Sequence, residues 1–554
     1  MKHRLRLLLG TVLGVSLLAM MALPAGASRG AEQSQPVQLQ ILAINDFHGQ
    51  LTPVGTLGGA DALGAYLRAA EATNPNTTIV SAGDLIGASP LISALFHDEP
   101  TIEAMNMIGL DINAVGNHEF DEGTDELLRM QNGGPHPVDG DLDGTPFPGA
   151  DFQFLAANVV SETTGKTLFP PYTIKNYQGV RVAYIGMTLE GTPTIVTPSG
   201  VAGYDFLDEA DTVNALVDKL KKINIEAIVV LVHEGGVQTL PGGANDCNGI
   251  SGPIVDIVER TSDEVDLFIT GHTHQNYNCI IDGRPVTSAR SISRVFTDID
   301  VELNRVTKEM TVKSINNVAT DRAAITPAQD IADFVSVYAA LSAPLANRVI
   351  GVISADITRT QNAAGESALG DVIADAQLAA TAPAGFGEAV AAFMNPGGIR
   401  ADLTYLASGT EADGEVTYGE SFTVQPFGNS LVTMTLTGAQ IDTLLEQQFD
   451  NPTPGASRML QVSQGFTYAW SASAPTGSKV DIASIMINGV PIDPNGTYRV
   501  TVNSFLASGG DNFAVLVQGT DNLGGDVDLD ALEDYFQAQG TVDPGPQNRI
   551  TQLP

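Results

Sequence analysis

Asp111-Ile-Asn-Ala-Val-Gly-Asn-His-Glu-Phe-Asp121 is the stretch from which the fold of this 554-residue chain can be inferred. Its apolar residues end at Val115 and a glycine breaks the run, which predicts a buried strand followed by a tight turn. Asn117 and His118 then emerge at the carboxyl end of a strand, where open α/β sheets bind ligands. Asp121 is predicted to hydrogen-bond the imidazole of His118 and fix its tautomer. Taken alone, the stretch fits equally well a turn with a capping Asn and a solvated His.

Four other apolar runs end in the same kinds of residue. The side chains that follow them are those of Asp46, His48, Asp84, His233, His272 and His274. A single histidine in such a place is usually a packing or surface residue, but five strand ends of this kind are improbable by chance. We therefore expect them to converge on one rim of an α/β sandwich of two sheets and to bind metal.

The expected ligands are carboxylates, an amide and imidazoles, with no cysteine among them. Such ligands select Zn, Mn, Fe, Co or Ni over a thiolate cluster. Their number is too high for one ion, so we expect two divalent ions that share a bridging carboxylate. Asp84 is the natural choice for the bridge.

The motifs, taken in order, resemble the five blocks of the calcineurin-like metallophosphoesterases. The blocks are Asn45-Asp-Phe-His-Gly49, Gly83-Asp84, Gly116-Asn-His-Glu119, His233-Glu234 and Gly271-His-Thr-His274. The first block, with a second domain following, is similar to the secreted bacterial 5′-nucleotidase family in particular. The resemblance implies an α/β chain with a four-layer α/β/β/α domain over residues 37–318, a linker helix, and an α+β substrate-binding domain over residues 348–554.

The resemblance also implies roles for the candidate residues. Asp46, His48 and His274 would hold one ion, Asn117, His233 and His272 the other, and Asp84 would bridge them. Two such ions activate a water and neutralise phosphoryl oxygens during in-line attack. His118, oriented by Asp121, would stabilise the charge and protonate the leaving ribose oxygen.

The linker helix is expected over residues 326–345, because Pro327 suits an early helical position and Pro344 lies near the end. From Arg348 onward the sequence has no histidine. The second half therefore cannot share the metal chemistry, and we expect it to hold the substrate.

Three turn sequences in the second half match the nucleotidase C-terminal domain. They are Asn395-Pro-Gly-Gly-Ile-Arg400, Gln425-Pro-Phe427-Gly428 and Asn503-Ser-Phe505-Leu-Ala-Ser-Gly-Gly-Asp511. Each alone fits packing or turn chemistry. The resemblance implies that Phe427 and Phe505 sandwich the base, Asp511 binds the ribose hydroxyls, Asn395 contacts the base, and Arg400 contacts the sugar or phosphate. Because every base has a π face, such a pocket tolerates different bases.

One departure concerns the phosphate. The family usually places an Arg a few residues before a Glu-x-x-x-Gly segment, here Glu366–Gly370, to grip the phosphate. The nearest Arg in this chain is Arg359, which becomes the candidate for that role.

The first 27 residues are predicted to be a signal peptide. Lys2, Arg4 and Arg6 precede an apolar run over residues 7–23, and Ala25-Gly-Ala27 supplies a cleavage site. The alternative is an uncleaved anchor, for which the run is short. We therefore expect export to the periplasm, the cell wall or the medium, without a stable membrane anchor.

The two cysteines, Cys247 and Cys279, flank the His272/His274 motif. In an exported chain with so few thiols we expect them to form a disulfide. The alternative, a pair of metal-binding thiols, lacks the close spacing of such sites.

The net charge of −37 argues against nucleic-acid polymers as partners, because their binding needs a basic surface. A small anionic nucleotide can still bind, because two cations dominate the local field. We expect a monomer. His97 and His136 are predicted to be surface residues, and residues 132–150 a surface loop whose Asp-rich start resembles a calcium loop without its final Glu.

These features predict a phosphomonoesterase that acts on nucleoside 5′-monophosphates. Hydrolysis of UDP-sugars or of 2′,3′-cyclic nucleotides is possible on the same scaffold. The other class of function is a nucleotide-binding surface protein without catalysis, but such a loss normally removes metal ligands, and all seven are present.

Overall fold

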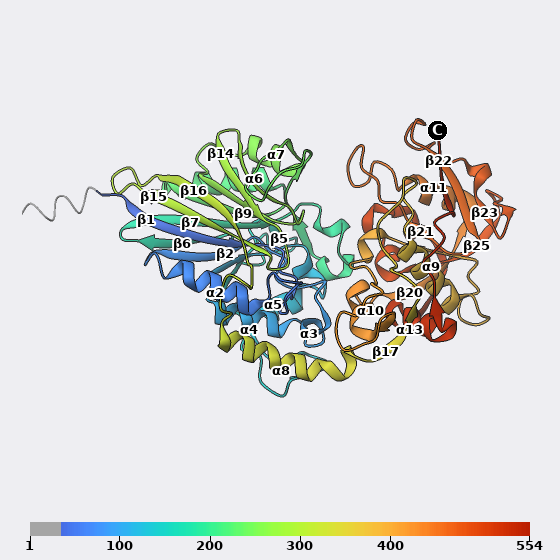
Figure 1. The fold of residues 1–554 in the computed structure, drawn as a ribbon. Helices are drawn as coiled ribbons and strands as arrows, with labels where there is room; N and C mark the ends of the chain where they lie inside the picture. Colours follow the sequence, from blue (N-terminus) through green and yellow to red (C-terminus); the bar gives the residue numbers. More distant parts are fainter. Residues whose placement is uncertain (1–34) are drawn as a thin grey trace, which may run out of the picture.

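The computed structural model describes residues 35–554 as two bodies joined by one helix, α8 (Gln329–Ala346). The predicted signal peptide, residues 1–27, lies outside the described residues. In Figure 1 the first body is blue to yellow-green, the second is orange to red, and α8 runs beneath both. Among residues 35–554, no helix is both long enough and apolar enough to cross a membrane.

Two six-stranded sheets form the centre of the first body. The strand order of the first sheet is β16-β15-β1-β2-β3-β4, and that of the second is β13-β14-β12-β9-β7-β6. In the first sheet, the strands are β1 (Val37–Ile44), β2 (Thr77–Ser81), β3 (Ile112–Ala114), β4 (Gln153–Leu155), β15 (Val295–Leu303) and β16 (Met310–Ala319). In the second, they are β6 (Tyr172–Tyr177), β7 (Val180–Thr188), β9 (Ala227–His233), β12 (Leu267–Thr270), β13 (Asn276–Ile281) and β14 (Arg284–Ala289).

Alternation along the strands builds a layered core. In β1, Leu39 and Ile41 face the second sheet, whereas Leu42 and Ile44 face helices on the outer side. Helices α2 (Ala60–Glu71), α4 (Glu99–Ile108), α5 (Thr124–Asn132) and α8 cover the first sheet. Helices α6 (Glu209–Lys222) and α7 (Pro253–Arg260) cover the second, so the layers run α/β/β/α (Figure 1). The predicted four-layer sandwich is confirmed.

Helix α8 begins three residues later than the sequence predicts and includes Pro344 in its last turn. It packs on α2, α3 (Leu91–Ala94) and α4 of the first body, and Arg68 of α2 pairs with Asp330 at 2.8 Å. It also touches α10 (Tyr418–Val424) of the second body. The helix is therefore built into the first body, and the chain enters the second body immediately after it.

A five-stranded sheet, in the order β21-β18-β25-β20-β26, organises the second body. Its strands are β18 (Ala391–Met394), β20 (Ser430–Thr437), β21 (Gln461–Val462), β25 (Thr497–Asn503) and β26 (Thr520–Val527). Helix α11 (Gly438–Glu446) packs on one face, and α9 (Ala368–Thr381) and α13 (Asp528–Gln539) lie on the other. This is the α+β arrangement expected for residues 348–554.

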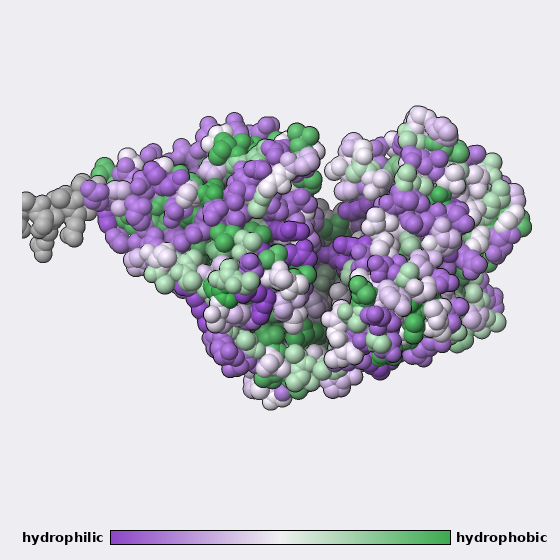
Figure 2. Space-filling view, viewed as in Figure 1, coloured by the Kyte–Doolittle hydropathy of each residue, from purple (hydrophilic) through white to green (hydrophobic). Residues whose placement is uncertain are grey.

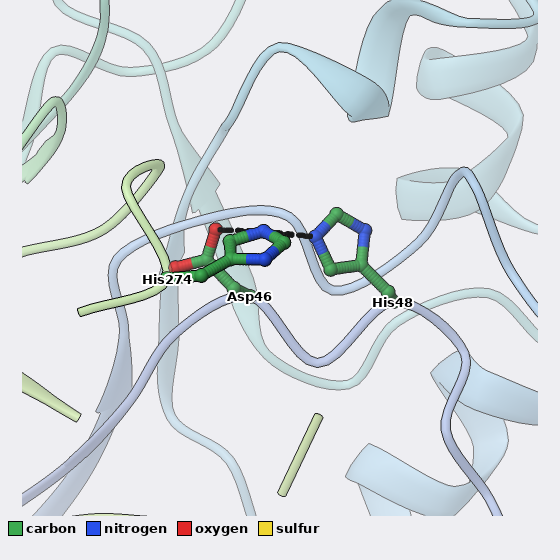
Figure 3. Close-up of side chains that lie close together, drawn as sticks. All are labelled: Asp46, His48 and His274. Atoms are coloured by element: carbon green, nitrogen blue, oxygen red, sulfur yellow. Dashed lines mark hydrogen bonds and ion pairs between the residues drawn. The ribbon is translucent and has the colours of Figure 1, made fainter. Parts of the chain in front are cut away.

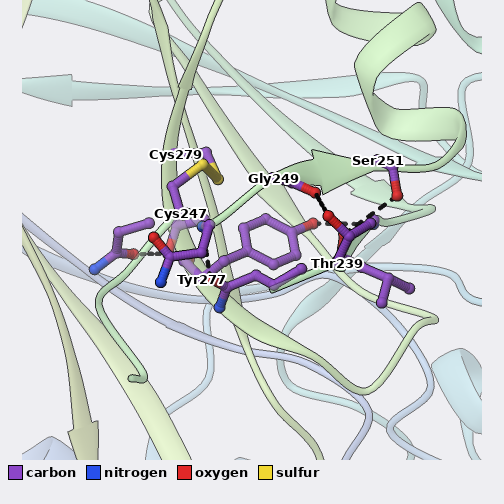
Figure 4. Close-up of a disulfide and its surroundings, with 12 residues drawn as sticks. Thr239, Cys247, Gly249, Ser251, Tyr277 and Cys279 are labelled. Atoms are coloured by element: carbon purple, nitrogen blue, oxygen red, sulfur yellow. Dashed lines mark hydrogen bonds between the residues drawn. A yellow bond between two sulfur atoms is a disulfide. The ribbon is translucent and has the colours of Figure 1, made fainter. Parts of the chain in front are cut away.

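The predicted disulfide between Cys247 and Cys279 is present, and it closes a sequence separation of 32 residues. It joins the loop after β10 (Val237–Gln238) to β13, as Figure 4 shows. Nearby, the Thr239 hydroxyl donates to the Gly249 carbonyl at 2.8 Å. The bond therefore braces the loop that follows His233 against the strand that follows His274.

Candidate active site

The five strand ends identified in the sequence meet at one edge of the first body. β1, β2 and β3 are parallel neighbours in the first sheet, where Ile44 pairs with Ser81 and Ser81 with Asn113. β9 and β12 are parallel neighbours in the second sheet, where Val232 pairs with Thr270. Because all five strands end at this edge, the polar residues that follow them come together.

Asp46, His48 and His274 form the first group of candidate ligands, shown in Figure 3. His48 Nε2 lies 3.0 Å from His274 Nε2, and His274 Nε2 lies 3.3 Å from Asp46 Oδ1. The Nδ1 atom of His48 lies 2.9 Å from the Gly87 carbonyl and donates to it, so Nε2 carries the lone pair. These atoms gather within reach of one ion, and a cation between them would satisfy the lone pair of His48 and the carboxylate of Asp46.

His233 and His272 form the second group with Asp84 and Asn117. The Nδ1 of His233 donates to the Ala82 carbonyl at 2.7 Å. Its Nε2 is buried without a hydrogen-bond partner and lies 2.9 Å from Asp84 Oδ2. His272 Nδ1 lies 2.9 Å from Asn117 Oδ1. These groups again direct acceptor atoms at a shared space.

Asp84 contacts both groups. Its Oδ2 lies 2.9 Å from His233 Nε2 and 3.7 Å from His48 Nε2, while its Oδ1 accepts from the His118 backbone N–H at 2.9 Å. A carboxylate in this place suits a bridge between two cations. The donor set therefore fits a pair of divalent ions, in agreement with the oxygen and imidazole chemistry that such ions prefer.

The pKa values of the histidines also fit a site that binds cations. Burial lowers the pKa of both His48 and His272 to about 3, which keeps their lone pairs free. Burial also acts to lower the pKa of His233, but the charge of Asp84 outweighs it and raises the pKa to about 10. Without metal, a proton on His233 compensates the carboxylate, and a metal ion would take over that role.

Five of the candidate ligands share a left-handed backbone conformation. Asp46, His48, Asp84, His272 and His274 have φ between 49° and 67°. The left-handed region costs a non-glycine residue on the order of 1–3 kcal/mol and is found mainly at functional sites. A β-carbon on the neighbouring Gly116 would lie 2.2 Å from Asp84 Oδ1, so only glycine allows this approach.

Glu119 is a site residue whose role the sequence did not reveal, although it belongs to the Gly116–Glu119 block. Its buried carboxylate accepts the backbone N–H groups of Asp84 and Leu85, each at 2.9 Å, and of Gly116 at 2.6 Å. Asn113 donates to it as well, at 3.2 Å. Glu119 therefore fixes the loop that presents Asp84.

His118 and Asp121 form the expected pair, with His118 Nδ1 2.7 Å from Asp121 Oδ2. Burial acts to lower the pKa of His118, but the carboxylates of Asp121 and Asp84 outweigh it and raise the pKa. The His118 ring lies parallel to the ring of Phe427 from the second body, with centroids 5.8 Å apart. The His118 ring is thus held between the two groups of candidate ligands and the second body.

A cavity of about 290 Å³ lies between the two bodies, beside His118. Figure 2 shows the surface hollowed between them, with hydrophilic residues around the opening. The first body contributes Asn117, His118 and His272 to its lining, and the second contributes Asn395, Arg400, Phe427, Asn429, Arg458, Phe505 and Asp511. Its size is near that of typical small-molecule sites.

The three turn sequences of the second body share one edge of its sheet. β18 is parallel to β25, and β20 is antiparallel to β25, with Leu431 opposite Asn503. Asn395 donates to Asp511 at 2.8 Å and accepts from Asn503 at 3.0 Å. The turns are therefore linked into one polar network at the cavity wall.

Arg458 and Asn429 are cavity residues that the sequence did not reveal. Arg458 pairs with Asp511, and burial nevertheless raises the pKa of that carboxyl. The side-chain oxygen of Asn429 accepts from the Ser504 hydroxyl at 3.1 Å and from the Phe505 backbone at 3.3 Å. The only sequence feature that could have indicated Asn429 is its position two residues after Phe427. No motif in the sequence indicates Arg458.

The two candidate arginines are placed differently. The Arg400 guanidinium lies 5.8 Å from the Phe427 ring centroid, and burial lowers its pKa although Asp121 and Asp84 act to raise it. Arg359 is exposed and donates to the Ile399 carbonyl at 3.0 Å, and it does not line the cavity. Arg400 therefore faces the metal groups, while Arg359 lies behind it.

His97 and His136, which the sequence predicts to be surface residues, are partly exposed. Their side chains are only 18% and 14% exposed, and their rings stack with centroids 3.7 Å apart. The loop over residues 132–150 folds back so that His136 meets His97, a tertiary contact that no local pattern indicates.

Two families match this chain. Residues 39–276 match the calcineurin-like phosphoesterases, and residues 349–518 match the C-terminal domain of 5′-nucleotidases. The chain is 34% identical over 525 residues to the endonuclease YhcR of Bacillus subtilis, covering 92% of this chain and 40% of that protein. It is 31% identical over 535 residues to the cell wall protein Lmo0130 of Listeria monocytogenes, covering 91% and 67%. A solved structure of a 5′-nucleotidase precursor from Thermus thermophilus aligns with a TM-score of 0.75 at 28% identity, covering 93% and 99%.

Proposed function

Because this chain belongs to the 5′-nucleotidase family of calcineurin-like phosphoesterases, we propose that it hydrolyses nucleoside 5′-monophosphates to nucleoside and inorganic phosphate. The observation that carries the proposal is that the candidate metal ligands gather beside a cavity, with Asn117 and His272 in its lining, and that the far wall of this cavity holds two phenylalanines and an aspartate. The candidate metal ligands suit the phosphate of a nucleotide, whereas the phenylalanines and the aspartate suit its base and its ribose.

The proposed ion sites follow the geometry of the two groups. One ion would be held by Asp46, His48 and His274, and the other by Asn117, His233 and His272, with Asp84 placed to serve both. Two divalent ions in such a site supply an activated water and neutralise phosphoryl oxygens. The low pKa values of His48 and His272, which keep these two imidazoles neutral, support this assignment.

His118 is the proposed acid. Asp121 accepts from its Nδ1, so the second proton of the protonated ring lies on Nε2, from which it can move to the leaving ribose oxygen. Arg400 faces the same space and supplies a fixed positive charge for the phosphate. Phe427 and Phe505 stack on the base, and Asp511, positioned by Arg458 and Asn395, accepts from the ribose hydroxyls.

A panel of phosphate-release assays tests the proposal. With Mn²⁺ or Zn²⁺ added, the full chain should release phosphate from AMP and other nucleoside 5′-monophosphates faster than it cleaves UDP-glucose, a 2′,3′-cyclic nucleotide or single-stranded DNA. The Bacillus relative is named an endonuclease, and this chain spans 40% of it, which is why DNA belongs in the panel. Faster cleavage of any of the other substrates would move the function to that class, and no release would leave a binding protein.

Export is part of the proposal. The predicted signal peptide over residues 1–27, the disulfide and the cell wall protein among the relatives all support it. Mass spectrometry of the protein from the medium or envelope of an expressing bacterium should show an N-terminus after Ala27. An intact N-terminus in the cytoplasm would contradict export.

A further inference from the structure

A second cluster of metal-binding side chain types lies outside the proposed two-ion site. His97 follows α3, Glu122 follows the 3₁₀ turn η1 (His118–Phe120), and His136 and Asp139 belong to the loop after α5. The two rings are stacked with 15° between their planes. The carboxylates of Glu122 and Asp139 are 49% and 44% exposed, so solvent ions can reach the cluster.

The atoms of this cluster point at a shared space. One ring nitrogen of each histidine and one carboxylate oxygen of Glu122 lie within 4.8 Å of one another. Asp139 Oδ2 lies 3.0 Å from His97 Nε2, which leaves His97 Nδ1, 3.0 Å from Glu122, as the nitrogen that faces the shared space. Asp139 Oδ2 also lies 3.3 Å from His136 Nδ1, so the same carboxylate contacts both rings. Metal-binding histidines are commonly oriented by such a carboxylate.

No Lys or Arg side chain among residues 35–554 pairs with the two carboxylates of the cluster. Among residues 35–554, the only side chains paired with Glu122 and Asp139 are the two histidines. Arg129 of the adjoining α5 is committed to Glu99 and Glu126. With Arg129 committed elsewhere, the two carboxylates leave a negative field at the rings that a divalent cation would offset.

Backbone conformation at His97 resembles that of the residues around the two-ion site. Its φ is 52°, in the left-handed region that also contains Asp46, His48 and Asp84. Such conformations are retained where the side chain must be held in one direction.

We propose that His97, Glu122 and His136, oriented by Asp139, form a third metal site that takes a divalent transition-metal ion such as Zn²⁺. Two imidazole nitrogens and a carboxylate favour such an ion over Ca²⁺ or Mg²⁺, which prefer oxygen ligands alone. Glu122 directly follows Asp121, and both His97 and Glu122 line the cavity. The ion would therefore fasten the loop after α5 to the segment that carries His118 and Asp121.

Metal counting on the full chain tests the site. After loading with Zn²⁺ and removal of excess ion, elemental analysis should give three ions per chain. The double variant His97→Gln/His136→Gln should give two, Glu122→Gln fewer than three, and the exposed control Glu259→Gln three. Two ions in the wild type, or three in the double variant, would overturn the third site.

A second measurement needs no variant of the cluster. Anomalous scattering from wild-type crystals grown with Zn²⁺ should show a peak between His97, Glu122 and His136, in addition to the pair at Asp84. Asp84→Asn should retain this peak while losing the pair, which separates the third site from the proposed nucleotidase chemistry. A map with peaks only at the pair would exclude the third site.

Discussion

At the scale of single residues, Asp84 carries the most weight, because it touches both groups of metal ligands. Asp84→Asn removes one negative charge from between two cations, so both ions of the pair should be lost and phosphate release should fall to background. Elemental analysis of the loaded variant measures the loss, with the exposed substitution Asp205→Asn as its control. Retention of both ions at the pair would show that Asp84 does not bridge.

His118 should behave differently, because its proposed role is that of an acid facing the substrate, although it lies beside His48 and Asp84. His118→Ala should lower kcat by roughly 10²–10⁴-fold, the usual contribution of a positioned acid. Its content of metal should equal that of the wild type. A loss of metal in this variant would place His118 among the ligands and remove it as the acid.

At the scale of elements, the strand ends were predictable because each apolar run is local and ends in a distinctive polar residue. His233 and Asp84 lie far apart in sequence, yet both positions follow from strands that end at the same edge. The cluster of His97 and His136 was not predictable, since it depends on how a loop without periodic pattern returns to the body. Arg458 was missed for the same reason, because its partner Asp511 is brought to it only by the fold.

The N-terminus of α13 gives a pH-dependent prediction. Asp528 is 2% exposed, and burial raises its pKa to about 7 although Asn429 and the backbone of Leu529 act to lower it. Because the folded-state pKa exceeds the unfolded one, the folded state binds the proton more tightly, and stability falls as pH rises from about 4 to about 7. Asp528→Asn should therefore raise Tm relative to the wild type more at pH 8 than at pH 4.5.

Calorimetry at the two pH values checks this effect, with the exposed Asp526→Asn as the matched control. One unit of pKa shift corresponds to about 1.4 kcal/mol, so even part of the shift is measurable. A Tm difference that does not change with pH would mean that Asp528 is not protonated in the folded protein at acidic pH.

At the scale of the whole molecule, we propose that the chemistry belongs to the first body and the recognition of the nucleotide to the second. Only the first body contains histidine among residues 35–554, and the second brings Phe427 against His118 across the cavity. This division was predictable from the distribution of histidines along the chain. The close approach of the two bodies could not be predicted from the sequence, because it depends on contacts made after α8.

The central claim is that the second body recognises the base while the first cleaves the phosphate ester, and one comparison tests it directly. Phe427→Ala/Phe505→Ala in the full chain should lower kcat/KM for AMP by roughly 10²-fold, because each stacked ring contributes about 1–3 kcal/mol. The value for p-nitrophenyl phosphate, which has no base, should change far less, and the exposed control Phe386→Ala should change neither. An equal fall for both substrates would show that the two rings serve packing, and it would contradict the account.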